Sequence, residues 1–299
     1  MFTKILFATS ATEASDHAAR VAFDMARRYG AHLCIFHVLG VPTRGFSQVV
    51  LDIKTGEKVE LDEDYIEWVK EEISTYYAKQ MADAHNYIIK VAVGFPHREI
   101  LREARQAEPD LIVMGGNTGE EGKPVYPRNI VGSTLQRVAK AAHCPILVVN
   151  RPAASFWGGM SKVVFGTDFS KASEAAFQFA CKLVRAIGGE LHIFHALDIS
   201  HMHLGRLRTQ DEIESKIREA LRMIRGKYIA RLEGIEDYAF DVWEGVPYVE
   251  IVKYARENHA DLIVMAHHSS KTDAEDTRLG SNIEQVMLRA GCPVISINR

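Results

Sequence analysis

A glycine-rich segment in the first half of the chain has the composition of an anion-binding loop. It reads Met114-Gly115-Gly116-Asn117-Thr118-Gly119, and after twelve intervening residues Gly132-Ser133-Thr134 opens a predicted helix. Glycines let the backbone approach a ligand and adopt positive φ, so that successive N–H groups can form an anion nest. A helix N-terminus adds free N–H groups and the positive end of its dipole. The segment therefore predicts a phosphate site, and a tight strand-to-helix turn is the simpler alternative.

A group of histidines in the second half is the other set of residues that could do chemistry. They fall in two predicted loops at the same end of the sheet as Asp168, and together with this carboxylate they could bind Zn²⁺, another divalent metal or a phosphorylated ligand. Their spacing matches no tight metal-ligand motif, so solvated loop histidines are the simpler interpretation and no metal ligand is assigned. The histidines are His201, His203, His267 and His268.

No catalytic motif accompanies these residues. The sequence contains no GxxxxGK[ST], GxSxG, HExxH or HxGH pattern. The loop after the first predicted strand, residues 9–12, contains no glycine and so is no dinucleotide fingerprint. We therefore predict no catalytic residues and, at most, slow hydrolysis of a bound nucleotide.

The elements that must position these residues occur twice along the chain. Residues 4–10 match residues 162–168, residues 110–114 match 261–265, and Cys144-Pro145 matches Cys292-Pro293. In the first half, apolar runs predict strands at 5–8, 32–38, 88–93, 110–114 and 146–149. Helical periodicity predicts helices over 18–29, 65–84, 98–106 and 134–142. Such alternation predicts a parallel sheet covered on both faces, whose ligands bind beyond the carboxyl ends of the strands.

On these motifs the chain resembles a tandem universal stress protein. Members carry G-x-x-G and then G-[ST] after a fourth strand like Asp110-Leu-Ile-Val-Met114, and their last strand follows Cys-Pro or Arg-Pro. Twelve residues separate Gly119 from Gly132, where members usually have nine. We expect an α/β protein of two doubly wound domains, 1–151 and 161–299, with a linker at 152–160. Each domain should hold a five-stranded parallel sheet in the order 3-2-1-4-5 with helices on both faces.

The resemblance also implies a ligand, because one branch of the family binds ATP with adenine against the ends of the first two strands. It implies ATP or a related adenine nucleotide in domain 1 and leaves Mg²⁺ open. Members usually have Asp where Ser10 stands, which weakens adenosine recognition in this half. The implied binding residues are Ala8, Thr9, Ser10, Val38, Met114, Gly115, Gly116, Asn117, Gly119, Gly132, Ser133 and Thr134.

The second half departs from the family pattern in the opposite way. It keeps the acidic residue after its first strand, Asp168, but Ala266 and Ser269 replace the glycines after its fourth strand. A side chain at each position should crowd a triphosphate. We expect domain 1 to bind the nucleotide and domain 2 to bind it poorly or not at all.

Composition sets the remaining expectations. The 299 residues are 47% hydrophobic and 25% charged, with a formal net charge of −3. This balance predicts a cytoplasmic globular protein without DNA-binding or membrane-spanning function. The resemblance implies that the halves pair through their last strands, 146–149 and 294–297, and favours a homodimer. The leading hypothesis is a stress-response sensor or regulator; the alternatives are a scaffold that binds no nucleotide, or a metal or small-ligand binder that uses the histidine-rich rim of domain 2.

Overall fold

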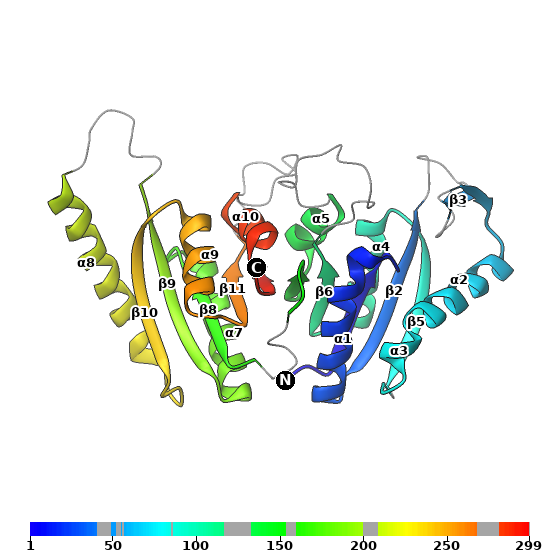
Figure 1. Ribbon diagram of the computed structural model, residues 1–299, viewed down its shortest axis with the longest axis horizontal. Helices are drawn as coiled ribbons and strands as arrows, with labels where there is room; N and C mark the ends of the chain where they lie inside the picture. The colour runs from blue at the N-terminus through cyan, green and yellow to red at the C-terminus, as the bar shows by residue number, and fades with distance from the viewer. Residues whose placement is uncertain are drawn as a thin grey trace. The chain divides into compact units, whose positions relative to one another are not determined.

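The computed structural model divides the chain into two compact units, Met1–Asn150 and Arg151–Arg299, called unit 1 and unit 2 below. Each unit is an α/β structure with a parallel sheet, as predicted (Figure 1). The residues that the structure describes are 1–40, 49–51, 55, 57–84, 86–116, 133–153, 160–199, 209–267 and 281–298.

The main sheet of unit 1 has parallel strands in the order β5-β2-β1-β6-β7. The chain therefore runs outward from β1 through β2 to β5, and then returns to the other side of β1 with β6. A separate antiparallel pair, β3 (Val49–Leu51) and β4 (Lys58–Glu60), was not predicted from the sequence. The main strands are β1 (Lys4–Thr9), β2 (His32–Gly40), β5 (Tyr87–Gly94), β6 (Leu111–Gly115) and β7 (Ile146–Val149).

Helices cover both faces of the unit 1 sheet (Figure 1). The first group is α1 (Asp16–Tyr29), which follows a 3₁₀ turn η1 (Glu13–Ser15), with α2 (Glu63–Tyr76) and α3 (Ala78–Met81). In this group α3 contacts both α1 and α2. The second pair, α4 (Pro96–Ala107) and α5 (Ser133–Ala141), packs together. Gly30 ends α1 in the left-handed conformation that glycine adopts without a steric cost.

Unit 2 repeats this arrangement, with the strand order β10-β9-β8-β11-β12. Its strands are β8 (Lys162–Gly166), β9 (Glu190–Asp198), β10 (Tyr238–Gly245), β11 (Leu262–Ala266) and β12 (Val294–Ile297). Its helices are α7 (Lys171–Ile187), α8 (Gln210–Lys227), the 3₁₀ turn η3 (Ile229–Arg231), α9 (Pro247–Glu257) and α10 (Ser281–Arg289). In both units the order reverses beside the first strand, where an open α/β sheet leaves a crevice at its carboxyl edge.

The predicted single helix over 65–84 is wrong, because it breaks at Tyr77. This residue lies between α2 and α3 with φ −99° and ψ 12°, and its side chain is fully buried. Its hydroxyl lies 2.6 Å from Thr9 Oγ1 at the end of β1. In unit 2, α8 likewise ends before the buried Tyr228, whose hydroxyl lies 2.7 Å from Thr167 Oγ1. A buried hydroxyl needs a hydrogen-bond partner. In both units the regular helix ends next to the tyrosine whose hydroxyl bonds to the threonine.

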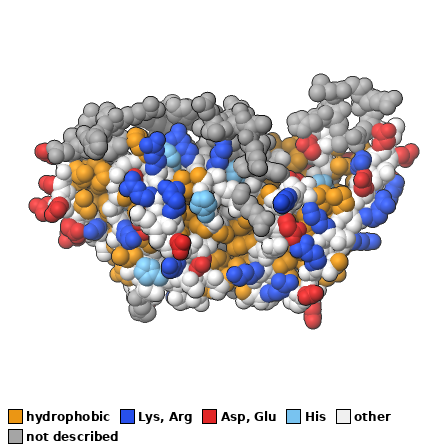
Figure 2. All heavy atoms as spheres, turned by 180° about the vertical axis from the view of Figure 1, so that it is seen from behind, with side chains coloured by type: hydrophobic (Ala, Val, Ile, Leu, Met, Phe, Trp, Pro, Cys, Tyr) orange, Lys and Arg blue, Asp and Glu red, His pale blue; other side chains and the backbone are white. Residues whose placement is uncertain are grey.

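The outer helix of unit 2 carries charges of both signs. Figure 2 shows Lys, Arg, Asp and Glu side chains together along the edge where α8 lies. Two ion pairs link them within the helix, Lys216–Glu219 at 2.6 Å and Arg218–Glu214 at 3.6 Å. Among the helices that the structure describes, none is both long enough and apolar enough to cross a bilayer.

The threonine–tyrosine bonds predict the stability of each unit. We expect Tyr77→Phe and Tyr228→Phe each to lower the free energy of unfolding by about 1–2 kcal/mol, since each leaves a buried threonine hydroxyl without one partner. Tyr87→Phe and Tyr238→Phe are matched controls, because these side chains are 40% and 41% exposed. Urea denaturation followed by circular dichroism measures the difference. Equal losses in the buried and exposed variants would show that the bond contributes nothing.

Candidate functional site

Unit 1 contains a cavity of about 310 Å³ at the carboxyl edge of its sheet. The ends of β1, β2 and β6 and the first turn of α5 line it, which is the crevice expected where the strand order reverses. Ser133 begins α5, while Asn117, Gly119 and Gly132 lie outside the described residues. The predicted site residues that the cavity brings together are Ala8, Thr9, Ser10, Val38, Met114, Gly115, Gly116 and Thr134.

The loop after β1 is held by its own hydroxyl groups. Thr9 Oγ1 accepts a hydrogen bond of 2.8 Å from the backbone N–H of Ala11, whose φ is +53°. The Ser10 hydroxyl lies 2.9 Å from Ser15 Oγ and 2.8 Å from Thr12 Oγ1. Because a non-glycine residue adopts positive φ only when its surroundings impose it, this network fixes the chain where it enters the cavity.

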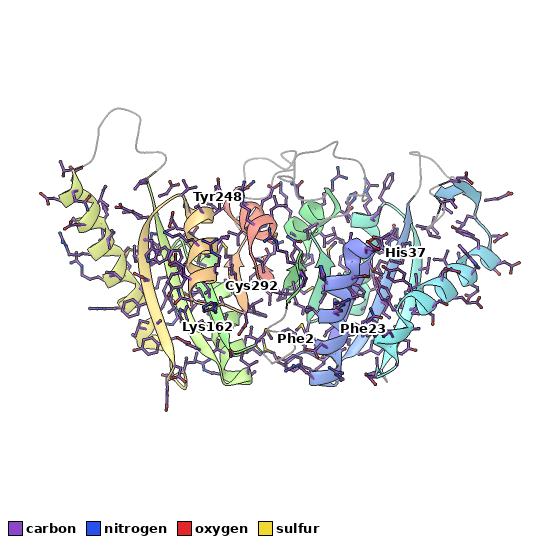
Figure 3. The ribbon with its side chains drawn as sticks, viewed as in Figure 1. Phe2, Phe23, His37, Lys162, Tyr248 and Cys292 are labelled. Atoms are coloured by element: carbon purple, nitrogen blue, oxygen red, sulfur yellow. The ribbon has the colours of Figure 1, made fainter. Side chains whose placement is uncertain are left out.

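His37 is a cavity residue that was not predicted as part of the site. It lies toward the carboxyl end of β2 (Figure 3), and its Nδ1 donates a 2.9 Å hydrogen bond to the carbonyl oxygen of Thr9. Burial lowers the pKa of the imidazole below its ordinary value of 6.5, and the bond to Thr9 opposes this only partly. The ring is therefore neutral, with Nε2 as a hydrogen-bond acceptor in the cavity wall. The signal in the sequence was the repeated Ile-Phe-His at 35–37 and 193–195.

Close packing explains the two glycines at the end of β6, Gly115 and Gly116. A Cβ on Gly116 would lie 1.3 Å from Asn150 Oδ1, and one on Gly115 would lie 2.8 Å from the carbonyl oxygen of Ala14. Neither residue has φ in the left-handed region, so the expectation of positive φ is wrong for these two. They are glycines because neighbouring groups occupy the place of a side chain, and both residues line the cavity.

Unit 2 has a larger cavity of about 540 Å³ at the equivalent edge. The ends of β8, β9 and β11 and the first turn of α10 line it. Asp168 Oδ1 accepts hydrogen bonds from the Ser170 backbone N–H at 2.9 Å and from Ser173 Oγ at 2.5 Å. His195 Nδ1 donates to the Thr167 carbonyl at 2.8 Å, and burial lowers its pKa, as for His37. The first-strand loop is thus held in the same way in both units.

The position after β11 differs from its counterpart in unit 1. The strand pairing sets Gly115 beside Val149 and Ala266 beside Ile297, so that Ala266 and His267 follow the register of Gly115 and Gly116. The expected pair of replacements, Ala266 and Ser269, is therefore corrected to Ala266 and His267 for these two glycines. The His267 backbone N–H donates to the carbonyl oxygen of Ile297 at 2.8 Å, and its side chain is only 2% exposed.

His267 is therefore buried, and the histidine-rich rim near Asp168 stays a prediction. A side chain placed where unit 1 has a closely packed glycine points into the interior, and His267 is not among the residues that line the cavity. His201, His203, His268 and Ser269 lie outside the described residues. Across the described ranges, no group of three or more His, Cys, Asp or Glu side chains could hold a metal ion.

The neutral state of His37 predicts a pH dependence of stability. Its pKa is lower in the folded chain than in the unfolded one, so its contribution is complete above pH 6.5 and is lost as the pH falls below that value. We expect His37→Asn, whose amide can still donate to Thr9, to reduce this loss by at most about 1.4 kcal/mol per pH unit. Urea denaturation at pH 7 and pH 5 measures how much unfolding free energy each protein loses between these two pH values. Equal losses in the two proteins would contradict the prediction.

Comparison with known proteins agrees with the duplicated fold. The universal stress protein family matches residues 1–150 and 160–298. Universal stress protein MJ0531 of Methanocaldococcus jannaschii is 31% identical over 160 residues, covering 51% of this chain and 84% of the relative. A universal stress protein structure from Archaeoglobus fulgidus has a TM-score of 0.69 at 21% identity, covering 99% of this chain and 96% of that one. A universal stress protein solved in complex with cAMP is 25% identical and has a TM-score of 0.34, covering 47% of this chain and 98% of that one. The chain belongs to the universal stress protein family, with one family domain in each half.

Proposed function

We propose that unit 1 binds ATP or a related adenine nucleotide and that the protein acts as a cytoplasmic stress-response sensor or regulator. The observation that carries the proposal is the cavity at the carboxyl edge of the unit 1 sheet. It places the backbone of Gly115 and Gly116 beside the first turn of α5, and no carboxylate belongs to its described lining. Backbone N–H groups and a helix N-terminus suit a phosphate, which an unpaired carboxylate would repel.

The remainder of the cavity suits a nucleoside. The ends of β1 and β2 supply apolar wall at Ala8, Phe36 and Val38, against which a flat ring can pack. His37 Nε2 offers an acceptor for a ligand N–H or O–H group, because Nδ1 already donates to Thr9. Such a division, with apolar wall at one end and N–H donors at the other, matches the two ends of a nucleotide.

Unit 2 is a poorer nucleotide site in this proposal. Ala266 and His267 follow the register of the two glycines, so that a side chain stands at each position that is glycine in unit 1. Asp168 and Asp198 line the unit 2 cavity at the register of Ser10 and Gly40 in unit 1. The two halves would thus share a scaffold and differ in ligand.

We expect slow hydrolysis at most. His37 is the only ionisable side chain in the described lining of unit 1, and it is held by Thr9. A Mg²⁺ ion would depend on the nucleotide phosphates for its ligands, since that lining supplies no carboxylate. Pairing of the halves through β7 and β12, and formation of a homodimer, remain predictions.

Calorimetric titration with ATP tests the proposal, and we expect one site per chain. The matched variants are Thr134→Asp and Asn282→Asp, which place a carboxylate in the first turn of α5 or α10, where acidic residues favour the helix. Both residues line their cavities. Thr134→Asp should weaken ATP binding at least about tenfold through repulsion of phosphate, while Asn282→Asp should leave it unchanged.

Three results would overturn the proposal. Two equal ATP sites per chain would show that the differences between the units do not matter. Loss of affinity in Asn282→Asp but not in Thr134→Asp would place the nucleotide in unit 2. Absence of binding in the unmodified protein would favour a scaffold that acts through protein contacts.

A further inference from the structure

The helix α4 of unit 1 turns its acidic side chains inward and its arginines outward. Glu99 is buried and pairs with Arg102 at 2.9 Å. Glu103 is buried and pairs with Lys90 at 2.7 Å. The exposed arginines of this helix follow one another at a spacing of three or four residues, which places them on one face. They are Arg98, Arg102 and Arg105.

The neighbouring helix α5 adds to this positive charge. It packs against α4 and carries Arg137 and Lys140 but no acidic residue. Arg137 is exposed, and its Nη1 donates a 3.4 Å hydrogen bond to His97 Nε2. Burial lowers the pKa of His97 below 6.5, and the positive charges of Arg137 and Arg98 lower it further. Figure 2 shows Lys and Arg side chains gathered on the side of unit 1 where α4 lies.

The charges of Arg98 and Arg137 are not neutralised within the part of the chain that the structure describes. Arg98 packs over the Phe95 ring, 5.2 Å from its centroid, and Arg137 has His97 as its hydrogen-bond partner. Neither forms an ion pair with a described residue. Like charges repel, and a negative group that binds near both arginines offsets this repulsion. The surface therefore attracts an anionic partner.

This positive charge is a property of unit 1 and no requirement of the fold. Counted from the first residue of each helix, the equivalent positions in α9 and α10 of unit 2 carry uncharged side chains. They are Val249, Gln285 and Leu288, against Arg98, Arg137 and Lys140 in unit 1.

A pocket of about 340 Å³ lies at the end of the same two helices. Leu101 and Ala104 of α4 belong to its wall, which is mostly apolar. Arg105 and Glu108 also line it, and their formal charges offset one another. The segments that follow α4 and α5 beside the pocket both belong to the described residues. Such a pocket suits an apolar side chain better than an ion.

We propose that unit 1 docks an acidic segment of a partner protein on its α4–α5 face, meaning Arg98, Arg137 and this pocket. Carboxylates of the segment meet the two arginines, and one of its large apolar side chains enters the pocket beside Arg105. From Arg98 to Arg105 the helix rises about 10 Å, which an extended segment of three or four residues spans.

A protein segment fits this face better than a nucleic acid does. The basic face is short, the whole chain has a formal net charge of −3, and the apolar pocket calls for an apolar group. The face uses no residue that lines the cavity at the carboxyl edge of the sheet, so the assignment does not depend on nucleotide binding.

A set of synthetic heptapeptides tests the charge and the pocket separately by calorimetric titration at low ionic strength. One peptide carries phenylalanine between glutamates, another alanine between glutamates, and the last phenylalanine between glutamines. We expect the first to bind, and each of the others to bind at least about tenfold more weakly, since one lacks the apolar group and the other the charge. Ala104→Leu, which fills the pocket, should remove the preference for phenylalanine over alanine.

Charge reversal tests where the peptide binds. Arg98→Glu and Arg137→Glu should each weaken the glutamate–phenylalanine peptide at least about threefold. Arg256→Glu is the matched control, because Arg256 is an exposed arginine of the corresponding helix in unit 2 and its reversal changes the net charge by the same amount. Glutamate is a good helix former, so all of these variants should keep their helices, which circular dichroism checks.

No binding of the glutamate–phenylalanine peptide, or equal affinity for all the peptides, would overturn the proposal. So would an equal effect of Arg256→Glu, which would reduce the preference to the net charge of the chain. Tighter binding of single-stranded DNA or of phosphatidylglycerol vesicles, lost in the same variants, would also overturn it, because the face would then recognise phosphate groups. A chain that binds the peptide but no ATP would refute the nucleotide proposal alone.

Discussion

The hydrogen bonds around one threonine hold the binding edge of each unit together. In unit 1, Thr9 Oγ1 joins the Tyr77 hydroxyl to the backbone N–H of Ala11, and the carbonyl oxygen of Thr9 accepts from His37. Thr167 makes the equivalent bonds in unit 2. This residue lies at the end of the first strand in unit 1 and directly after it in unit 2. Its bonds reach the tyrosine that follows the second helix, the loop after the first strand, and the second strand. The cavity wall is thus built on a buried polar network in which each member has a partner.

Irregular backbone accompanies this network in both units. Ala11 and Phe169 adopt φ of +53° and +61°, although neither is glycine. In unit 1 the helical segment is interrupted at Tyr77, between α2 and α3, and in unit 2 α8 ends before Tyr228. Since the same irregularities occur in both units, they belong to the common scaffold and not to the ligand of either half. What separates the halves lies on the surface of the cavity, where Ser10 in one unit corresponds to Asp168 in the other.

Duplicated folds of this kind can diverge in ligand without diverging in architecture. The strands that form the cavity floor keep their order and register in both units. Exchange of a few side chains at the strand ends then changes the residues that line the cavity and the space available. Function is carried by these residues and not by the fold, and so family membership leaves the ligand of each half to be determined by experiment.

The sequence by itself determined the repeat, the strands and the edge of the sheet where a ligand would bind. Apolar runs and helical periodicity are local properties, and a parallel sheet brings the ends of its strands to one edge by geometry alone. The same local periodicity predicted an unbroken helix over 65–84, because nothing near Tyr77 in the sequence reveals a partner at Thr9. Only the tertiary structure decided that Gly116 is required by Asn150, that His267 is buried, and that the unit 2 cavity stays open. These depend on contacts between residues distant in the sequence, which no local pattern records.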